Sequence, residues 1–329
     1  MPSTSAPATT GVSTTERADQ PTEVPTTPAA PTTVAPTTSA EPAAPTAPLV
    51  VMWAGGAVAL HDPATGDIVN IVSTFQPEAA WVTDLDRAAD GTIVYSLAVE
   101  DSWYSCDTSQ GFAEAILPDG TFTSLGMGGG VDLSPDGARV ALVRSSGCEP
   151  DPTEPMFVVV NPDTVADRSV HASDERAWSF PGATYSADAA PVLNGAVWSG
   201  TSLVAAGAGR LVMIDPAQDA VPDLSEGVPI QLSSGEPGAA TLVGARADGT
   251  LLAVVHDQDN LARVVTLDPS TGAEVTELAP GGEWWFVSAD PSGAHWVGLR
   301  GDAVLVDGLV VELQRPDPAI DDHPVAVGW

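Results

Sequence analysis

The stretch VDLSPDGARVALVRSSG, residues 131–147, and the stretch PMFVVVNPDT, residues 155–164, carry the pattern that decides the fold. An Asp-Gly turn at residues 136–137 leads into the apolar run ARVALVR, and a second apolar run, FVVV, ends at a Pro-Asp turn. Proline presets the first dihedral angle of a turn, aspartate caps its own backbone, and glycine accepts a positive φ. Strand, tight turn and strand, with no helical period between them, predict an antiparallel meander.

Both kinds of turn recur along the chain in the same order, which is the signature of a repeat architecture. Turns of the first kind precede an apolar strand and lie at residues 90–91, 136–137, 199–200, 248–249 and 292–293. Turns of the second kind lie in HDPATGD (61–67), LPDGT (117–121), NPDTVAD (161–167), DPAQD (215–219), DPSTGAE (268–274) and VDGL (306–309). These turns divide residues 80–313 into five units of four strands.

The two ends of the chain complement each other. LVVMWAG (49–55), AVALHD (57–62) and DIVNIV (67–72) supply three strands, and HPVAVGW (323–329) supplies one apolar strand of the innermost type. Joined, they complete a sixth unit and remove the free edges of the sheet array. We therefore predict an all-β fold, a six-bladed β-propeller of four-stranded antiparallel blades over residues 48–329, whose closing blade is shared by both termini. A stack of β-sandwich repeats is the alternative, but sandwich strands rarely keep two turn types in a fixed order.

The unit at residues 131–164 resembles the WD40-like repeat of TolB-type propellers, which has a Ser-Pro-Asp-Gly turn, an apolar strand and a later Asp turn. The match is clear at Ser134, Pro135, Asp136 and Gly137 and weaker at residues 289–293. The resemblance implies the architecture. Propellers of this family scaffold proteins, accompany hydrolases or bind small ligands, so the resemblance leaves the function open.

Residues 1–47 consist almost entirely of Thr, Pro, Ala and Ser. Such a segment buries too little apolar surface to offset its ordering entropy, and we expect a disordered stalk. It is similar to the stalks of actinobacterial surface lipoproteins. The first residues lack the basic and apolar parts of a signal peptide, and no apolar run reaches the roughly 18 residues that span a bilayer. We therefore expect an extracellular or cell-surface protein whose signal segment is absent from this chain, with no direct membrane insertion.

The chain is strongly acidic, with 44 acidic side chains against 11 basic ones and a net charge of −33. All the basic residues are arginine, because the sequence contains no lysine. Nucleic acid and anionic lipid are excluded as partners, since no basic patch is present to displace counterions from phosphate. The acidity itself is typical of solubility or of adaptation to salt.

The two cysteines, Cys106 and Cys148, fall in equivalent loops of consecutive predicted blades. Equivalent loops of neighbouring blades lie side by side, so the positions predict a disulfide, which would contribute about 4 kcal/mol on the chain-entropy estimate. A disulfide implies an oxidising compartment and favours export. Two free thiols or a metal-binding pair are the alternatives, although a pair lacks the remaining ligands of a structural zinc site.

Long loops are predicted on one face, which we call the long-loop face: Glu100–Gln110, Ser145–Pro155, Ala172–Pro191 and Gln314–Asp322. Aromatic rings interleaved with carboxylates in these loops suit a sugar, a cationic group or a protein partner. The alternative is that the rings pin the loops onto the blades. Trp284 and Trp285 open an inner strand, where one ring is expected to pack between blades and the other to reach the channel. The candidate ligand-binding residues are Asp101, Trp103, Tyr104, Arg176, Trp178, Tyr185, Trp284 and His323.

Calcium is the most suitable ion for a chain rich in oxygen ligands and poor in histidine. Asp257, Asp259 and Asn260 alternate in HDQDN and form the candidate metal site, with a plain solvated turn as the alternative. No other cofactor is expected.

No GxSxG elbow, HExxH motif or phosphate loop is present. We therefore predict an extracytoplasmic, monomeric, non-catalytic binding or scaffold module that recognises a protein or glycan partner at the cell envelope. The alternative is a calcium-dependent, lactonase-like hydrolase in the central channel. For that alternative, His323, Asp321 and Asp322 would join Asp101 or Glu283 at the channel mouth.

Overall fold

In the computed structural model, all the strands belong to the unit that runs from Pro42 to Trp329. No helix among its described residues is long and apolar enough to cross a membrane. The residues that it describes are 43–74, 80–99, 112–127, 129–135, 137, 139–145, 156–161, 176–180, 193–207, 209–217, 224–233, 240–256, 261–318 and 322–329.

The described strands form six four-stranded antiparallel sheets, each ordered from its innermost strand outward. Three are β24 (Pro324–Gly328), β1 (Leu49–Trp53), β2 (Ala57–His61), β3 (Ile68–Thr74); β4 (Ala80–Arg87), β5 (Ile93–Val99), β6 (Phe112–Ile116), β7 (Phe122–Met127); and β8 (Gly129–Leu133), β9 (Val140–Ser145), β10 (Met156–Asn161), β11 (Arg176–Phe180). The others are β12 (Leu193–Ser199), β13 (Ser202–Gly207), β14 (Arg210–Ile214), β15 (Val228–Pro229); β16 (Ala240–Ala245), β17 (Leu251–His256), β18 (Ala262–Leu267), β19 (Glu274–Gly282); and β20 (Trp284–Ala289), β21 (Trp296–Arg300), β22 (Ala303–Val306), β23 (Leu309–Val311). A short 3-10 helix, Leu224–Glu226, precedes β15.

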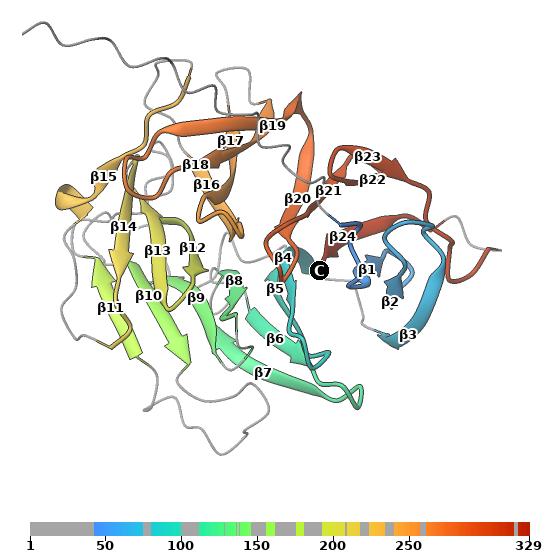
Figure 1. Ribbon diagram of the computed structural model, residues 1–329. Coiled ribbons are helices and arrows are strands. Elements are labelled where there is room, and N and C mark those ends of the chain that lie inside the picture. The colour runs from blue at the N-terminus through green and yellow to red at the C-terminus, as the bar shows by residue number, and fades with distance from the viewer. Residues whose placement is uncertain are drawn as a thin grey trace, which may run out of the picture. The chain divides into compact units, whose positions relative to one another are not determined.

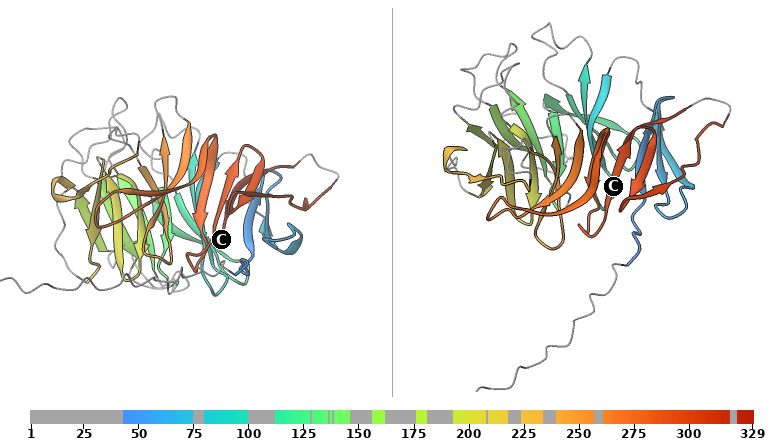
Figure 2. Two further views of the ribbon diagram at one scale, coloured as in Figure 1. Left: turned by 45° about the horizontal axis from the view of Figure 1, so that its top comes forward. Right: turned by 90° about the horizontal axis from the view of Figure 1, so that it is seen from above.

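The sheets lie around a common centre (Figure 1). Their innermost strands touch in the order β24, β4, β8, β12, β16 and β20, and β20 touches β24 again. Figure 2 shows the same arrangement from two further sides. The prediction of an all-β fold of four-stranded antiparallel blades in a propeller arrangement is therefore confirmed.

The sheet that joins the two ends of the chain pairs β24 with β1, placing Val51 opposite Val327, as the complementary end strands predict. Its inner residues enter one buried apolar cluster with β21 and β22, in which Trp53 and Trp329 are the largest side chains. Ala47 packs against this cluster, and the carbonyl of Ala43 lies 2.7 Å from His295 Nε2. Contacts with the folded unit therefore begin before residue 48.

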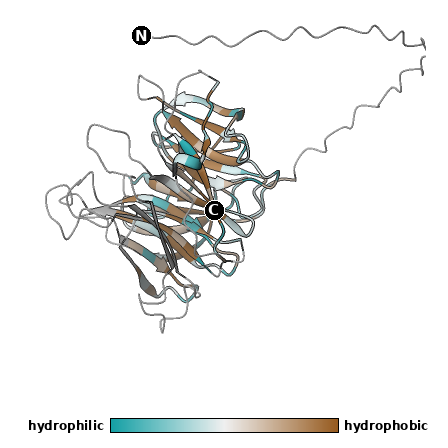
Figure 3. Ribbon diagram, turned by 90° about the vertical axis from the view of Figure 1, so that its left-hand side faces the viewer, coloured by the Kyte–Doolittle hydropathy of each residue, from teal (hydrophilic) through white to brown (hydrophobic). Residues whose placement is uncertain are grey.

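The inner and outer strands differ in sequence because the sheets cover each other. LVVMW in β1 is buried along its whole length, whereas IVNIVST in β3 is mostly exposed. In a strand that is covered on both faces, burial of every apolar side chain stabilises the fold. In an outer strand, the apolar side chains that face water do not contribute in this way. Figure 3 shows the apolar residues following the strands and the polar residues gathering at the turns.

One loop assignment is wrong. Arg176 and Trp178 lie in strand β11, where they pair with Val160 and Val158 of β10, and the expected loop over residues 172–191 is therefore interrupted by a strand. The alternation in RAWSF suits an outer strand, but its aromatic and charged residues resemble those of the neighbouring loops. The predicted residues that lie outside the described part of the chain are Asp101, Trp103, Tyr104, Cys106, Cys148, Tyr185, Asp257, Asp259, Asn260 and Asp321.

Candidate functional site at the channel mouth

Every innermost strand contains a break in register, which marks a β-bulge. The breaks lie between Val82 and Asp84 in β4, and at matching places in β8, β12, β16, β20 and β24. A bulge bends the strand and re-aims the neighbouring side chains. In β20 the extra residue is Trp285, which is 67% exposed. The bulges thus shape the surface that the inner strands present to the centre.

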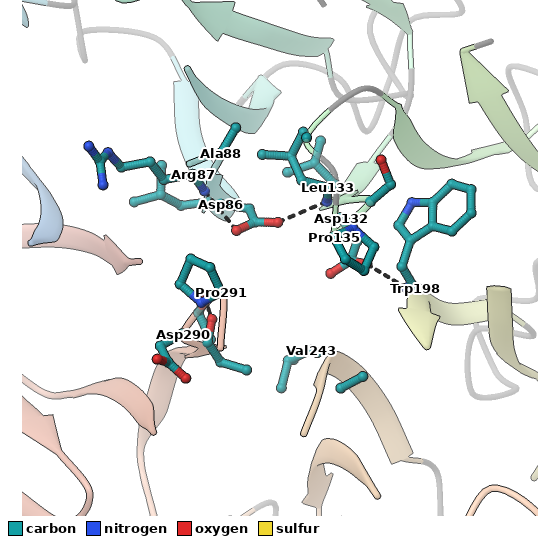
Figure 4. Close-up of a pocket in the computed structure, with 18 of the residues that line it drawn as sticks. Asp86, Arg87, Ala88, Asp132, Leu133, Pro135, Trp198, Val243, Asp290 and Pro291 are labelled. Carbon is teal, nitrogen blue, oxygen red and sulfur yellow. Dashed lines mark hydrogen bonds between the residues drawn. The ribbon is translucent and has the colours of Figure 1, made fainter. Parts of the chain in front are cut away.

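Three carboxylates stand on these inner strands and bridge neighbouring sheets. Asp84 Oδ2 accepts a hydrogen bond from the Val131 N–H at 3.0 Å. Asp86 Oδ2 accepts one from the Leu133 N–H at 2.8 Å. Figure 4 shows this bond, as well as the equivalent bond from the Trp198 N–H to Asp132 Oδ2 at 2.5 Å. The carboxylates therefore tie β4 to β8 and β8 to β12.

The second oxygens of two of these carboxylates are also occupied. Asp84 Oδ1 accepts the N–H of Leu85 at 2.9 Å, and Asp86 Oδ1 accepts the N–H of Arg87 at 2.7 Å. Within the described residues, no donor meets Asp132 Oδ1. Asp132 Oδ1 is thus the one oxygen of the trio for which the described residues supply no donor.

Burial dominates the electrostatics of the trio. It raises the pKa of Asp84 to about 6, against the lowering effect of the Val131 and Leu85 N–H groups. Burial likewise raises the pKa of Asp86 to about 7, with a smaller contribution from the nearby charge of Asp84. The pKa of Asp132 is raised well above its usual value, first by burial and then by repulsion from Asp86. Three carboxyls gathered away from water resist full ionisation.

The trio lines a cavity of about 100 Å³ at the C-terminal ends of β4, β8, β12, β16 and β20. A polar cavity of this size has room for water molecules. Typical sites for small organic ligands measure about 300–1,000 Å³. On the far side of the cavity, β16 and β20 contribute the small residues Gly244 and Ser288. Trp198 closes one wall beneath the guanidinium of Arg139, 4.3 Å from the ring centre.

The two tryptophans that open β20 differ in burial. Trp284 is 8% exposed, meets Trp296 with ring centres 5.8 Å apart, and donates Nε1–H to the carbonyl of Pro280 at 3.3 Å. Trp284 is therefore a packing residue in this structure, and Trp285 is the exposed one. Trp53, Trp198 and Trp296 are buried.

His323 is exposed and lies just before β24, in a second hollow between the outer part of the β20–β23 sheet and the shared sheet. It does not line the cavity that holds the three aspartates. In the described part of the chain, no group of three His, Cys, Asp or Glu side chains is placed to hold a metal ion.

Sequence reasoning missed Asp84, Asp86 and Asp132. A signal was present, because Asp86 and Asp132 stand at the same distance before the turn glycines Gly91 and Gly137, and each directly follows an apolar residue. A charged residue repeated at one register of an inner strand indicates a shared role between blades. The role itself depends on N–H groups of the next sheet, which local sequence does not reveal.

The closed array of four-stranded antiparallel sheets defines a protein of the β-propeller class. No family model and no curated protein matches the chain. Among solved structures, a protein of unknown function from Bacteroides caccae is 12% identical, with 86% of this chain and 98% of that chain covered and a TM-score of 0.52.

Two further solved structures are similar in coverage. The periplasmic gluconolactonase PpgL of Pseudomonas aeruginosa is 16% identical over 85% of this chain and 98% of its own, with a TM-score of 0.44. A putative 6-phosphogluconolactonase from Bacteroides uniformis is also 16% identical, over 85% and 98%, with a TM-score of 0.45. Similarity at this level concerns the fold and assigns no activity.

Proposed function

We propose that the chain is a six-bladed, non-catalytic binding or scaffold propeller of the cell envelope that recognises a protein or a glycan through its long-loop face. The observation that carries this proposal is the use of the channel carboxylates. Asp84, Asp86 and Asp132 hold neighbouring sheets together through backbone N–H groups. Five of the six carboxylate oxygens in this trio already accept a backbone N–H bond, so these side chains serve to join and orient the inner strands.

The size of the channel cavity favours the same proposal. A volume of about 100 Å³ accommodates water and is too small for a sugar-sized substrate. The alternative, a calcium-dependent hydrolase of the lactonase type, requires a substrate to lie next to catalytic carboxylates in this channel. It therefore requires the cavity to open.

The placement of the long connections favours the opposite face for recognition. The connections from β5 to β6, from β9 to β10 and from β23 to β24 all leave the sheets on one side. The turns from first to second strands, next to the three aspartates, are short. Long segments on a rigid scaffold are the usual location of binding residues.

A paired variant tests the proposed face. We expect the double variant Trp103→Ala, Tyr104→Ala to lose at least about tenfold of the affinity for a partner identified by glycan array or by crosslinking in an envelope extract, since aromatic anchors dominate such interfaces. Phe122→Ala, which removes a ring 40% exposed on an outer strand, is the matched control. Calcium-dependent hydrolysis of a lactone panel that Asp132→Asn abolishes would instead establish the enzyme.

Export is the second part of the proposal and rests on the Thr- and Pro-rich residues 1–47 and on Cys106 and Cys148. We propose that these cysteines form a disulfide. Intact-mass measurement with alkylation tests it: without reductant no alkylated cysteine is expected, and with reductant two are. Two modified thiols in the untreated protein would contradict the bond.

A further inference from the structure

A second hollow, the rim cleft, has a volume of about 450 Å³, within the range of small-ligand sites. Its walls come from β22 and β23, from the segment after β23, and from the residues that precede and open β24. The hydrogen bond from the Gln314 N–H to the Gly66 carbonyl, at 2.9 Å, fixes the segment after β23 on the shared sheet. The cleft is therefore a built feature of the seam between two sheets.

The cleft has more negative than positive groups. Asp302, Glu312 and Asp322 line it together with Arg315. Asp322 is 5% exposed, and its Oδ1 accepts the Gly55 N–H at 2.7 Å. Asp302 and Glu312 are less buried than Asp322. Two accessible carboxylates thus flank the opening above a third that is fixed in the wall.

The remaining wall is apolar. Val304 is buried and Val310 is 65% exposed, and both line the cleft. Leu309 on β23 and Val69 on β3, which do not line the cleft, are also exposed. Exposed apolar surface next to fixed charges marks a contact surface for another protein.

We propose that the rim cleft binds a lysine side chain of a protein partner. The carboxylates of Asp302 and Glu312 match its ammonium group, and the valines match its methylene stem. The chain contains no lysine, so neither the chain itself nor a second copy can fill the cleft in this way. The net charge of −33 further attracts a basic partner.

This inference rests on the proposed function, which supplies the protein partner. It deepens that function because the segment that forms the cleft belongs to the long-loop face. It assigns a chemical role to a part of that face that the structure describes. It also gives His323, which lines the cleft, a place at the site without a catalytic part.

Isothermal titration with a blocked pentapeptide, acetyl-Ala-Leu-Lys-Leu-Ala-amide, tests the proposal, and the same peptide with acetylated lysine is the matched ligand. Acetylation removes the charge. We expect the acetylated peptide to bind the wild-type chain at least about tenfold more weakly than the lysine peptide does. The double variant Asp302→Asn, Glu312→Gln should bind the lysine peptide at least about tenfold more weakly than the wild type does. In both cases charge-assisted hydrogen bonds are lost.

Glu226→Gln, the same loss of charge at an exposed residue outside the cleft, is expected to change the affinity by less than about twofold, because screened charges act weakly at a distance. Val310→Arg is an independent variant that places a guanidinium at the opening and should abolish binding. Equal affinity for both peptides, or no saturable binding to the wild-type chain, would overturn the proposal. If 1,5-diaminopentane bound more tightly than the lysine peptide, the proposal that the ammonium group belongs to a protein partner would be overturned.

The two proposals fail separately. If the lysine peptide does not bind but the partner is still captured through Trp103 and Tyr104, only the proposal that the rim cleft binds lysine is overturned. If the double variant Trp103→Ala, Tyr104→Ala captures the partner as well as the wild type does, and the lysine peptide still binds, only the proposal about Trp103 and Tyr104 on the long-loop face is overturned.

Discussion

Carboxylates line both the channel mouth and the outer surface, and the two regions use them in opposite ways. At the channel mouth, Asp86 accepts two backbone N–H bonds, and burial raises its pKa to about 7. On the outer surface, Glu274 accepts two bonds from Arg263, at 2.6 and 2.8 Å, and its pKa falls to about 2. A carboxylate that meets only neutral donors in a confined space is destabilised when ionised, and one that meets a cation is stabilised.

The same contrast separates the two hollows. The channel cavity is small, and its carboxylates are committed to neighbouring sheets. The rim cleft is larger, and Asp302 and Glu312 are accessible at its opening. Carboxylates alone therefore do not define a binding site, and the rim cleft is the one we propose because it combines accessible carboxylates with sufficient volume.

A large loss of stability is expected where the rim segment meets the shared sheet. Gly66 has a φ of +76°, and a Cβ placed on it would lie 1.9 Å from the Glu312 carbonyl oxygen. Gly66→Ala should lower the free energy of unfolding by about 3 kcal/mol, since it combines backbone strain with a backbone clash. Gly200→Ala is the control, because Gly200 has a φ of +62° with no atom within 4 Å of the added Cβ. It should cost about 1 kcal/mol. Chemical unfolding of both variants measures the difference, and equal losses would contradict the packing of residues 312–315.

The ion pair on the outer surface comes next. Glu274→Gln should cost about 1–3 kcal/mol at pH 7, because the side chains of Arg263 and Glu274 are 14% and 6% exposed and the bond is charge-assisted. Since hydrogen bonding to Arg263 lowers the pKa of Glu274 from 4.5 to about 2, the contribution is present above pH 4.5 and is lost as the pH falls toward 2. Urea unfolding of variant and wild type at pH 7 and pH 2.5 measures it. Glu277→Gln, whose side chain is 48% exposed, should cost no more than about 0.5 kcal/mol.

The turns and the carboxylate sites also differ in how far the sequence reveals them. The turn chemistry at residues 90–91 and 136–137 is local, so it predicts the strands that follow and the complementary end strands that close the array. The function of Asp86 is not local, because it depends on the Leu133 N–H of another sheet. The rim cleft is equally non-local, since it needs Gln314 to meet Gly66. Strand β11 was missed because its residues resemble those of the loops around it.

The channel carboxylates should give the opposite pH dependence to Glu274. Because the folded pKa values of Asp84 and Asp86 are raised to about 6 and about 7, their contribution to stability is greatest below the ordinary pKa of 3.8 and is lost as the pH rises through 7. The double variant Asp84→Asn, Asp86→Asn cannot ionise at these positions. It should lose stability less steeply than the wild type between pH 4 and pH 7. Asp248→Asn is the control, since hydrogen bonds from Thr250 lower the pKa of Asp248 and place its titration below this window. Parallel pH profiles for wild type and double variant would show that Asp84 and Asp86 ionise freely.

The smallest effect is expected at the exposed ring of the inner strands. Trp285→Ala should change the free energy of unfolding by no more than about 0.5 kcal/mol, because a side chain 67% exposed contributes little packing. Trp284→Ala should cost about 3–5 kcal/mol, since its ring is buried against Trp296. The two variants are adjacent in sequence and identical in chemistry, so thermal unfolding of the pair isolates the effect of the bulge that turns one ring inward and the other outward. Similar losses for both would mean that Trp285 is covered in solution, and the bulge would then not present it at the surface.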